Sequence, residues 1–339
     1  MEELKMDLRI NMTHGSGGKA TSELIGSVFS GRLGNPVLNR MEDAAVLNMN
    51  EVLLKGGKMA YTTDSFVVSP IFFNGGDIGR LAVCGTVNDL LCMGAKPLYL
   101  TAGFIIEEGL MVDDLERIVN SMAEALKESG TVIAAADTKV IEGKGGIYIN
   151  TSGIGCIPEG VHVGADRLAP GDAVILSGTL GDHHACILSH RLEIANDIAS
   201  DAAPLNCIVD ALSGKGVNVK AFRDVTRGGL ATILNELADA SACTIHLDHQ
   251  AIPVAGTVSA LCEILGLDPL YMGNEGKLAV VVSREDAKMA LELIRNVKYG
   301  ENAAIIGMVQ KGKGVTISTD TGGTRILNML YGEGLPRIC

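Results

Sequence analysis

The sequence predicts an α/β protein of two domains followed by a short tail. Its 339 residues exceed a typical single domain, and 47% hydrophobic with 20% charged residues fits a well-packed core. Strand-like apolar runs alternate with helical patterns up to the turn-rich stretch Ile157–Gly160, and the alternation then starts again. We therefore expect domains at residues 1–157 and 158–325, with a tail at 326–339.

The composition excludes several classes of protein. A net charge of −12 argues against nucleic-acid binding, which needs clustered Lys and Arg. No apolar run approaches the ~18 residues of a membrane span, and the charged start Met1–Asp7 does not fit a secretory signal. The eight cysteines show no C-x-x-C pair and no zinc-ligand spacing, so we expect a reducing, cytoplasmic location.

A glycine-rich stretch, Thr13–Thr21, is the first candidate site. Gly15, Gly17 and Gly18 would let backbone amides converge on an anion, and Lys19 adds a positive charge beside them. The spacing does not match a Walker A loop, and a glycine-rich turn without a ligand is the more common structure. The stretch is therefore only a weak indication of phosphate binding.

A well-defined helix is predicted from Asp77, which caps it, to about Gly94. Asn88 interrupts its apolar face, and Asp89 follows directly. A buried amide and carboxylate need partners, which a metal or a nucleotide would supply. A purely structural role for both residues is an equally good interpretation.

Other acids lie where predicted strands meet loops. Asp43 precedes a strand-like run, Asp64 ends the strand that starts at Met59, and Asp137 ends the apolar strand that starts at Thr131. Each aspartate alone is best explained as a turn cap. Together with Asp89, however, Asp64 and Asp137 match the ligands of Mg²⁺, which a few carboxylates hold along with phosphate oxygens.

The second domain offers two more glycine-containing turns. Arg227 lies beside two glycines at the start of a predicted helix, which suits an anion. The turn Asn274–Lys277 precedes an apolar strand, and Gly276 would allow close backbone approach to a ligand, although an ordinary strand-entry turn is equally consistent. His183 and His184 are adjacent, so they cannot form a same-face helical metal pair, and we interpret them as helix-start residues.

The chain ends on a thiol at Cys339. Gly332 and Gly334 give the approach conformational freedom, and Pro336 restricts it. A frayed tail is the alternative, but an exposed free cysteine is an oxidation liability without a packing benefit. The tail therefore predicts that the rest of the chain acts on a group carried by this thiol.

Together these motifs resemble the HypE family of hydrogenase-maturation carbamoyl dehydratases over nearly the whole chain. The resemblance rests on His14-Gly15-Ser16-Gly17-Gly18, Thr63-Asp64-Ser65, Gly85-Thr86-Val87-Asn88-Asp89, Asp137-Thr138-Lys139, Thr226-Arg227-Gly228-Gly229, Asn274-Glu275-Gly276-Lys277 and Pro336-Arg337-Ile338-Cys339. It implies the fold shared by aminoimidazole ribonucleotide synthetase and selenophosphate synthetase, with two α/β domains of mixed sheets. In that fold the first domain dimerises through its sheet to build an ATP cleft, and the second covers it. We therefore expect a homodimer, in which strands near Tyr61 and Leu98 are covered.

The resemblance also implies a reaction. A partner carbamoyltransferase, HypF, places a carbamoyl group on Cys339. ATP phosphorylates the carbamoyl oxygen, and loss of phosphate leaves a thiocyanate. The product supplies cyanide ligands for the iron of [NiFe]-hydrogenases through the HypC–HypD assembly complex.

Roles for the motif residues follow from the same resemblance. It implies ATP and Mg²⁺ as cofactors, with metal ligands at Asp43, Asp64, Asp89 and Asp137. Nucleotide binding is expected from these aspartates together with Lys19, Asn88, Thr138 and Arg227. The expected catalytic residues are Cys339 as carrier, Glu275 as general base, and Lys139, which suits phosphate or the carbamoyl oxygen.

Two alternatives are less consistent with the sequence. Relatives such as selenophosphate synthetase carry a cysteine or selenocysteine in the N-terminal glycine loop, whereas this loop has His14 and Ser16 and no thiol. A non-catalytic carrier that only presents Cys339 would have no use for a Mg²⁺–triphosphate site.

Overall fold

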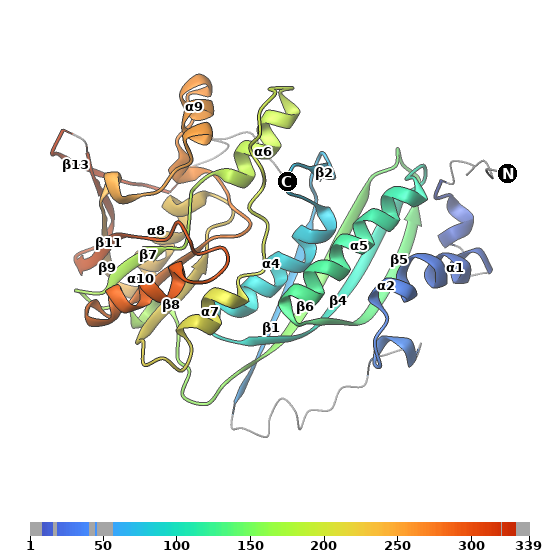
Figure 1. Ribbon diagram of the computed structural model, residues 1–339, viewed down its shortest axis with the longest axis horizontal. Coiled ribbons are helices and arrows are strands. Elements are labelled where there is room, and N and C mark those ends of the chain that lie inside the picture. Colours follow the sequence, from blue (N-terminus) through green and yellow to red (C-terminus); the bar gives the residue numbers. More distant parts are fainter. Residues whose placement is uncertain (1–8, 16–18, 41–44, 46–56, 320, 330–339) are drawn as a thin grey trace.

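The computed structural model describes residues 9–15, 19–40, 45, 57–319 and 321–329, in two halves that meet along helix α4 (Figure 1). We refer to residues up to 157 as the first half and to the remainder as the second half. Asp43, the part of the tail from residue 330 to Cys339, and most of the glycine loop lie outside the described residues, as does the side chain of Lys19.

The first half is built on a four-stranded sheet in the order β1-β6-β4-β5. Strands β4 and β5 are parallel, and the other neighbours are antiparallel. The strands of this sheet are β1 (Lys58–Phe66), β4 (Lys96–Glu107), β5 (Val132–Ile141) and β6 (Ile147–Ile157), while β2 (Phe72–Phe73) and β3 (Gly76–Asp77) pair in a separate two-stranded sheet. The helices are α1 (Lys19–Leu24), α2 (Gly31–Leu33), α4 (Ile78–Cys92) and α5 (Val112–Ser129).

Helix α4 forms where the sequence predicts it. The Asp77 side chain accepts a hydrogen bond from the backbone N–H of Arg80 at 3.0 Å and so caps the first turn. Most of the helix is buried, because α5 and the first sheet surround it on one side and the second half on the other (Figure 1). Side chains of α4 therefore reach both halves.

Strand β5 does not end at Asp137, and that prediction is wrong. It continues to Ile141, with Asp137 opposite Gly103 and Lys139 opposite Ile105 on β4. The parallel partner β4 extends far enough to offer backbone hydrogen bonds throughout. These bonds outweigh the polarity of the side chains, which an edge strand can direct toward solvent.

Among the described residues, α4 and α5 both pack on one face of the first sheet and leave its other face uncovered (Figure 1). Tyr61 is 66% exposed there and Met59 is 50% exposed. Tyr61 lies opposite the half-buried Ile154 of β6. An uncovered apolar sheet face of this kind is characteristic of a protein–protein contact.

The second half is built on a seven-stranded mixed sheet in the order β13-β12-β9-β11-β7-β10-β8. Strands β9 and β12 are parallel, and the other neighbours are antiparallel. The strands are β7 (Ala173–Leu176), β8 (Val219–Asp224), β9 (Cys243–Leu247), β10 (Leu278–Val282), β11 (Ala304–Lys311), β12 (Gly314–Ser318) and β13 (Thr324–Ile326). The helices are α6 (Asp182–Arg191), α7 (Asn206–Leu212), α8 (Gly229–Ser241), α9 (Gly256–Leu265) and α10 (Ala287–Arg295). The predicted α/β class with mixed sheets is confirmed.

Strand β10, which lies next to the edge strand β8, divides two hydrophobic cores. Ala279 and Val281 pack in the core that contains α8, whereas Leu278 and Val280 pack in the core that contains α7 and α10. The latter core continues into α4 and α5 of the first half. The boundary expected at residue 157 therefore separates two sheets but does not divide the hydrophobic core.

A polar cluster, which we call the Glu128 clamp, also joins the halves. The carboxylate of Glu128 on α5 lies 3.0 Å from the Arg80 guanidinium on α4 and 2.6 Å from the Lys298 ammonium of the second half. The Tyr299 hydroxyl donates to the same carboxylate. Three donors from two halves thus converge on one acid.

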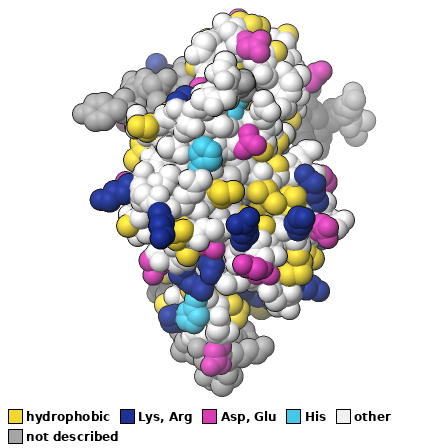
Figure 2. Space-filling model, turned by 90° about the vertical axis from the view of Figure 1, so that its left-hand side faces the viewer, with side chains coloured by type: hydrophobic (Ala, Val, Ile, Leu, Met, Phe, Trp, Pro, Cys, Tyr) yellow, Lys and Arg dark blue, Asp and Glu magenta, His cyan; other side chains and the backbone are white. Residues whose placement is uncertain are grey.

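The outer face of the second half carries mixed charge. Figure 2 shows Lys and Arg side chains interspersed with Asp and Glu around a central area of hydrophobic side chains. This pattern fits the argument from net charge against a nucleic-acid surface. Among the described residues, no helix is long and apolar enough to cross a membrane.

Candidate active site between the two halves

A cavity of about 720 Å³ lies between the halves, and carboxylates dominate its wall. Strand β1 and helix α4 contribute one side, and the ends of β8 and of the loop before β10 contribute the other. Its ionisable lining residues are Asp64, Asp89, His183, Arg223, Asp224, Arg227 and Glu275. The cavity thus unites Asp64, Asp89, Arg227 and Glu275, which the sequence predicted as site residues.

Backbone geometry places the two aspartates of the first half together. A Cβ atom at Gly85 would lie 2.8 Å from the Phe66 ring and 3.5 Å from Oδ2 of Asp64, so glycine lets the end of β1 approach α4 closely. Asp89 follows Gly85 by about one helical turn and accepts a hydrogen bond of 2.8 Å from the Thr62 hydroxyl. Both carboxylates therefore reach the same wall.

The acids of this wall raise one another's pKa. Burial raises the pKa of Asp64, and the nearby charge of Asp89 adds to the effect. Burial, again followed by the charge of Asp89, raises the pKa of Asp224 to about 6. Burial also raises the pKa of Asp89. The cavity therefore brings carboxylates together in buried surroundings that oppose their ionisation, and a bound cation would favour their ionised forms.

Glu275 has the most strongly perturbed carboxyl of the cavity. Burial raises its pKa well above the ordinary value, the charges of Asp201, Asp224 and Asp64 raise it further, and Arg227 partly opposes them. Within the described residues, its side chain has no hydrogen bond or ion pair. A carboxylate in such surroundings is a stronger base than usual, which supports the predicted role of general base.

The glycine of the Glu275 loop serves a different purpose from the one expected. A Cβ atom at Gly276 would lie 1.8 Å from the backbone oxygen of Asp201. The close approach that glycine permits is therefore to another segment of the protein, and the expectation of a ligand at that position is wrong.

His183 belongs to the cavity wall, although the sequence indicated only a helix-start residue. Its ring packs edge-on against Phe73, and its Nδ1 lies 2.8 Å from the Ser200 hydroxyl. Burial lowers its pKa to about 4, so the ring is neutral at neutral pH. A pair of histidines directly after a glycine turn was the only signal available for this position.

The Asp137–Lys139 motif does not line this cavity. It lies on β5, at the opposite edge of the sheet from β1. Asp137 and Lys139 are exposed and point to the uncovered face, while Thr138 points to the helix-covered side. Roles for these residues at the cavity of the same chain have no support in the described structure.

Asn88 is fully satisfied without a ligand. Its Oδ1 accepts from the backbone N–H of Leu205 at 2.9 Å, and its Nδ2 donates to the backbone oxygen of Ala203 at 3.0 Å. The amide is buried, and the second half supplies both partners. The argument that Asn88 needs a metal or nucleotide is therefore wrong, and the residue instead connects the halves.

The donor set fits Mg²⁺ only when phosphate completes the coordination. Among the described residues, no three Asp, Glu, His or Cys side chains gather closely enough to hold a metal ion by themselves. Magnesium is commonly held by one or two carboxylates plus nucleotide phosphates. The unneutralised carboxylates of Asp64 and Asp89 fit that pattern, and Asp43 lies outside the described residues.

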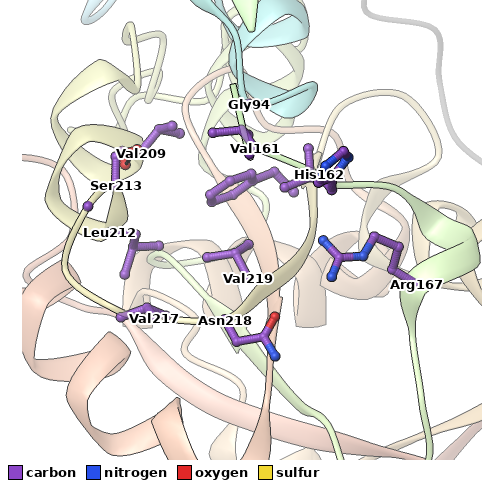
Figure 3. A pocket seen from close by; sticks show the side chains of 14 residues that line it. Gly94, Val161, His162, Arg167, Val209, Leu212, Ser213, Val217, Asn218 and Val219 are labelled. Carbon is purple, nitrogen blue, oxygen red and sulfur yellow. Dashed lines mark hydrogen bonds between the residues drawn. The ribbon is translucent and has the colours of Figure 1, made fainter. Parts of the chain in front are cut away.

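A second cavity, of about 310 Å³, has a different character (Figure 3). Its wall is formed largely by apolar side chains such as Val161, Leu212 and Val219, with Arg167 and Asn218 at the side. Among the residues that the structure describes, no Asp or Glu lines it. It therefore lacks the acids that make the larger cavity a candidate for metal–nucleotide chemistry.

Comparison with known families accounts for both halves. Residues 41–157 match the family described as AIR synthase related protein, N-terminal domain, and residues 169–320 match AIR synthase related protein, C-terminal domain. Thiamine-monophosphate kinase from Stenotrophomonas maltophilia K279a shares the fold at 21% identity with a TM-score of 0.64. The predicted aminoimidazole ribonucleotide synthetase-like fold is confirmed.

Full-length relatives identify the family within this fold. The chain is 46% identical to carbamoyl dehydratase HypE of Azotobacter vinelandii over 99% of each chain. It is 44% identical to HypE of Escherichia coli K12 over 97% of this chain and 99% of that protein. A solved HypE in complex with ATP superimposes with a TM-score of 0.91 at 45% identity, covering 97% of this chain and 99% of the other. The chain belongs to the HypE family of carbamoyl dehydratases.

Proposed function

We propose that this chain dehydrates a carbamoyl group on the thiol of Cys339 in an ATP-dependent reaction. The thiocyanate product then supplies cyanide ligands for the iron of [NiFe]-hydrogenases. Membership of the HypE family supports the activity, and a solved relative binds ATP. The observation that carries the proposal to this chain is the acid-lined cavity, in which Asp64, Asp89 and Glu275 come together from both halves.

Dehydration requires that the carbamoyl oxygen become a leaving group. Transfer of the γ-phosphoryl group of ATP to that oxygen achieves this, after which the oxygen departs with phosphate. Two protons leave the nitrogen, and the carbon–nitrogen bond becomes a triple bond. Overall, the water lost from the carbamoyl group is accounted for by the hydrolysis of ATP to ADP and phosphate.

The residues of the cavity have separate tasks in this scheme. Asp64 and Asp89 would hold Mg²⁺, which neutralises phosphate charge and polarises the transferred phosphoryl group when bound. Arg227, which is exposed at the cavity wall, is placed to bind phosphate. Glu275 accepts a proton from the carbamoyl nitrogen, as its raised pKa suits it to do.

A second copy of the chain is part of the proposal. The uncovered sheet face with Tyr61 packs against its counterpart in a homodimer, which removes that apolar surface from water. Asp137 and Lys139 lie on the same face, so their expected roles require that they act across this contact. Lys19 and Thr138 remain proposed nucleotide ligands on the basis of family resemblance.

The expected partners follow from the family. A solved relative, described as a HypE–HypF complex, superimposes with a TM-score of 0.78 at 48% identity over 91% of this chain and 99% of that one. We propose that HypF carbamoylates Cys339, that the HypC–HypD complex accepts the cyanide group, and that all of this occurs in the cytoplasm.

The test uses the full chain carbamoylated at Cys339. After addition of ATP and Mg²⁺, mass spectrometry of the C-terminal peptide should show loss of one water, together with release of phosphate in equal amount. The variant Cys339→Ala should bind ATP but form no thiocyanate. Carbamoylated protein that hydrolyses ATP without losing water would overturn the proposal.

A further inference from the structure

We infer that Asp201 and Asn88 are positioning residues that fix the carboxylate of Glu275 relative to Asp89, the proposed metal-binding acid on α4. We call Asn88, Asp201 and the segment 201–205, which Asn88 contacts at Ala203 and Leu205, the Asn88–Asp201 brace. The inference rests on the proposed function, because it matters only if Glu275 acts as the base. Neither residue faces the cavity, so both would act through Glu275.

The carboxylate of Asp201 binds every residue of the loop 274–277, which contains Glu275. Asp201 accepts a hydrogen bond from each of four successive residues, of which the two outer ones donate from the side chain and the two inner ones from the backbone. These donors are Asn274 Nδ2 at 3.0 Å, Glu275 N at 3.1 Å, Gly276 N at 3.2 Å and Lys277 Nζ at 2.9 Å. Such a set leaves the loop little freedom, so the direction of the Glu275 side chain is set by Asp201.

The backbone of Glu275 is held on its other side as well. The backbone N–H of Ala203 donates to the Glu275 carbonyl oxygen at 3.4 Å. Glycine at 276 lets the two segments come this close. Glu275 is thus tied at both its N–H and its carbonyl to the stretch 201–203.

Asn88 anchors that stretch to α4. Its amide binds the backbone of Ala203 and of Leu205, as described above. The neighbouring residue along α4 is Asp89, a proposed Mg²⁺ ligand. A continuous set of buried and partly buried hydrogen bonds therefore runs from the helix that carries Asp89 to the loop that carries Glu275, across the contact between the halves.

Asp201 keeps its charge in this position. Burial alone would raise its pKa, but the Lys277 ammonium, with help from His183 and the backbone N–H of Glu275, holds it below the ordinary value. The Lys277 ammonium also lies 3.7 Å from Asp182. The retained charge faces Glu275, so Asp201 contributes to basicity as well as to position.

Positioning of this kind has a large kinetic effect because proton transfer depends steeply on geometry. A displacement of about 1 Å can lower a rate by about 100-fold. ATP binding depends on other groups, namely the acids of the first half and Arg227. Loss of the brace should therefore slow dehydration and leave nucleotide affinity nearly intact.

The first experiment compares Asp201→Asn with a matched control. In single-turnover reactions of the carbamoylated chain with ATP and Mg²⁺, Asp201→Asn should slow thiocyanate formation by about 100-fold. ATP affinity should change by less than about threefold. The control Asp172→Asn makes the same change at another buried aspartate, which accepts from Ala169 N at 2.8 Å within its own turn. Asp172→Asn should form thiocyanate at the wild-type rate and bind ATP with wild-type affinity.

The pH profile separates positioning from a general loss of structure. The groups that face Glu275 are Asp201, Asp224, Asp64 and Arg227, with the neutral His183 in the same wall. Removing the negative charge of Asp201 lowers the pKa of Glu275, so the acid limb of the rate profile should move to lower pH. An unmoved limb would show that Asp201 does not act on Glu275 electrostatically and would overturn that part of the inference.

Asn88→Ala tests the other end of the brace, and it remains informative if Asp201→Asn fails to fold. It should slow dehydration by about 10-fold without moving the acid limb, since no charge is lost. Its control is Asn206→Ala, which removes a different link between the halves, from Asn206 Nδ2 to Ser129 O at 3.1 Å. Equal effects of the two alanine variants would overturn the role of Asn88.

Glu275→Gln distinguishes failure of this inference from failure of the proposed function. If Glu275→Gln dehydrates at the wild-type rate, Glu275 is not the base and the proposed function is wrong at that point. Glu275→Gln could instead be inactive while Asp201→Asn and Asn88→Ala both dehydrate at the wild-type rate. The assignment of Glu275 as the base would then hold, and the positioning role of Asp201 and Asn88 would be wrong.

Discussion

The cavity and the Glu128 clamp both place carboxylates between the two halves, but they treat charge in opposite ways. In the cavity, burial and mutual repulsion raise the pKa of Asp64 and bring that of Asp224 to about 6. In the clamp, burial acts in the same direction. Hydrogen bonds from Lys298, Tyr299 and Arg80 nevertheless lower the pKa of Glu128 to about 2.

The difference separates structural acids from functional ones. Glu128 has cations on both sides and needs nothing further, so its charge stabilises the contact between the halves. In the cavity, Arg223 and Arg227 offset the raised pKa of the acids only in part, so ionisation of these acids is disfavoured in the free protein and a bound cation is favoured. The cavity acids are more deeply buried than Glu128, whose side chain is 26% exposed, and they lack its three donors, so burial and pairing together distinguish the two clusters.

The largest expected effect is on Glu275, the least paired acid of the cavity. Glu275→Gln should lower the rate of thiocyanate formation by about 1,000-fold, because proton removal from the carbamoyl nitrogen loses its base. ATP affinity should stay within a few-fold of wild type. Rapid-quench assays with fluorescent-nucleotide titrations measure both, and a rate within tenfold of wild type would contradict the assignment.

The two aspartates of the first half should affect an earlier step. Asp64→Asn or Asp89→Asn should abolish Mg²⁺-dependent ATP turnover while far-UV circular dichroism stays unchanged, because a carboxylate ligand is lost. Raising the Mg²⁺ concentration should restore part of the turnover. Normal turnover in either variant would show that these acids are turn caps.

The clamp should respond in stability instead of activity. Glu128→Gln leaves Arg80 and Lys298 without their acid and should destabilise the fold by about 2 kcal/mol in urea titrations. Since the folded pKa of Glu128 is lowered to about 2, its contribution is present above the unfolded pKa and is lost as pH falls toward 2. Turnover per folded molecule should match wild type. A loss of turnover in the folded variant would show that Glu128 is a functional acid as well as a structural one.

Substitution of Asp224 should have the smallest effect, and it should stabilise the fold, whereas Glu128→Gln destabilises it. Its folded pKa is raised to about 6, so its ionised form destabilises the protein as pH rises through that value. Asp224→Asn should therefore raise the free energy of unfolding by about 1 kcal/mol at about pH 8, with the gain vanishing below the ordinary aspartate pKa. A loss of stability at both pH values would show that its hydrogen bonds matter more than its charge.

Local signals predicted much of the fold. Helix α4 begins at its Asp77 cap and ends close to Gly94, because capping and helical spacing act over a few residues. The prediction of where β5 ends was wrong because the length of β5 is set by β4, which pairs with the whole of β5. That partnership depends on the tertiary structure and leaves no mark in the residues near Asp137.

The site was predictable to the same extent. Asp64, Asp89 and Glu275 stand in recognisable motifs, and the structure brings them together. Asp201 was missed because it lies in no motif, and its partners are 73 to 76 residues away in sequence. The sequence correctly indicated that Asn88 is buried and needs hydrogen-bond partners. These partners are backbone groups of the second half, which the sequence near Asn88 does not indicate.

The segment Ser200–Leu205 contains no helix or strand, yet it is bound along its length. Ser200 N donates to Asn74 O at 2.8 Å, and Arg80 Nε donates to Ala202 O at 2.6 Å, in addition to the contacts of Asp201 and Ala203. Loops are ordinarily where a chain accepts insertions or new termini. Here one added residue would shift the anchors by about 3.8 Å relative to one another. A circular permutant or a fused reporter therefore belongs in the exposed turn at residues 213–216, and not in this connection.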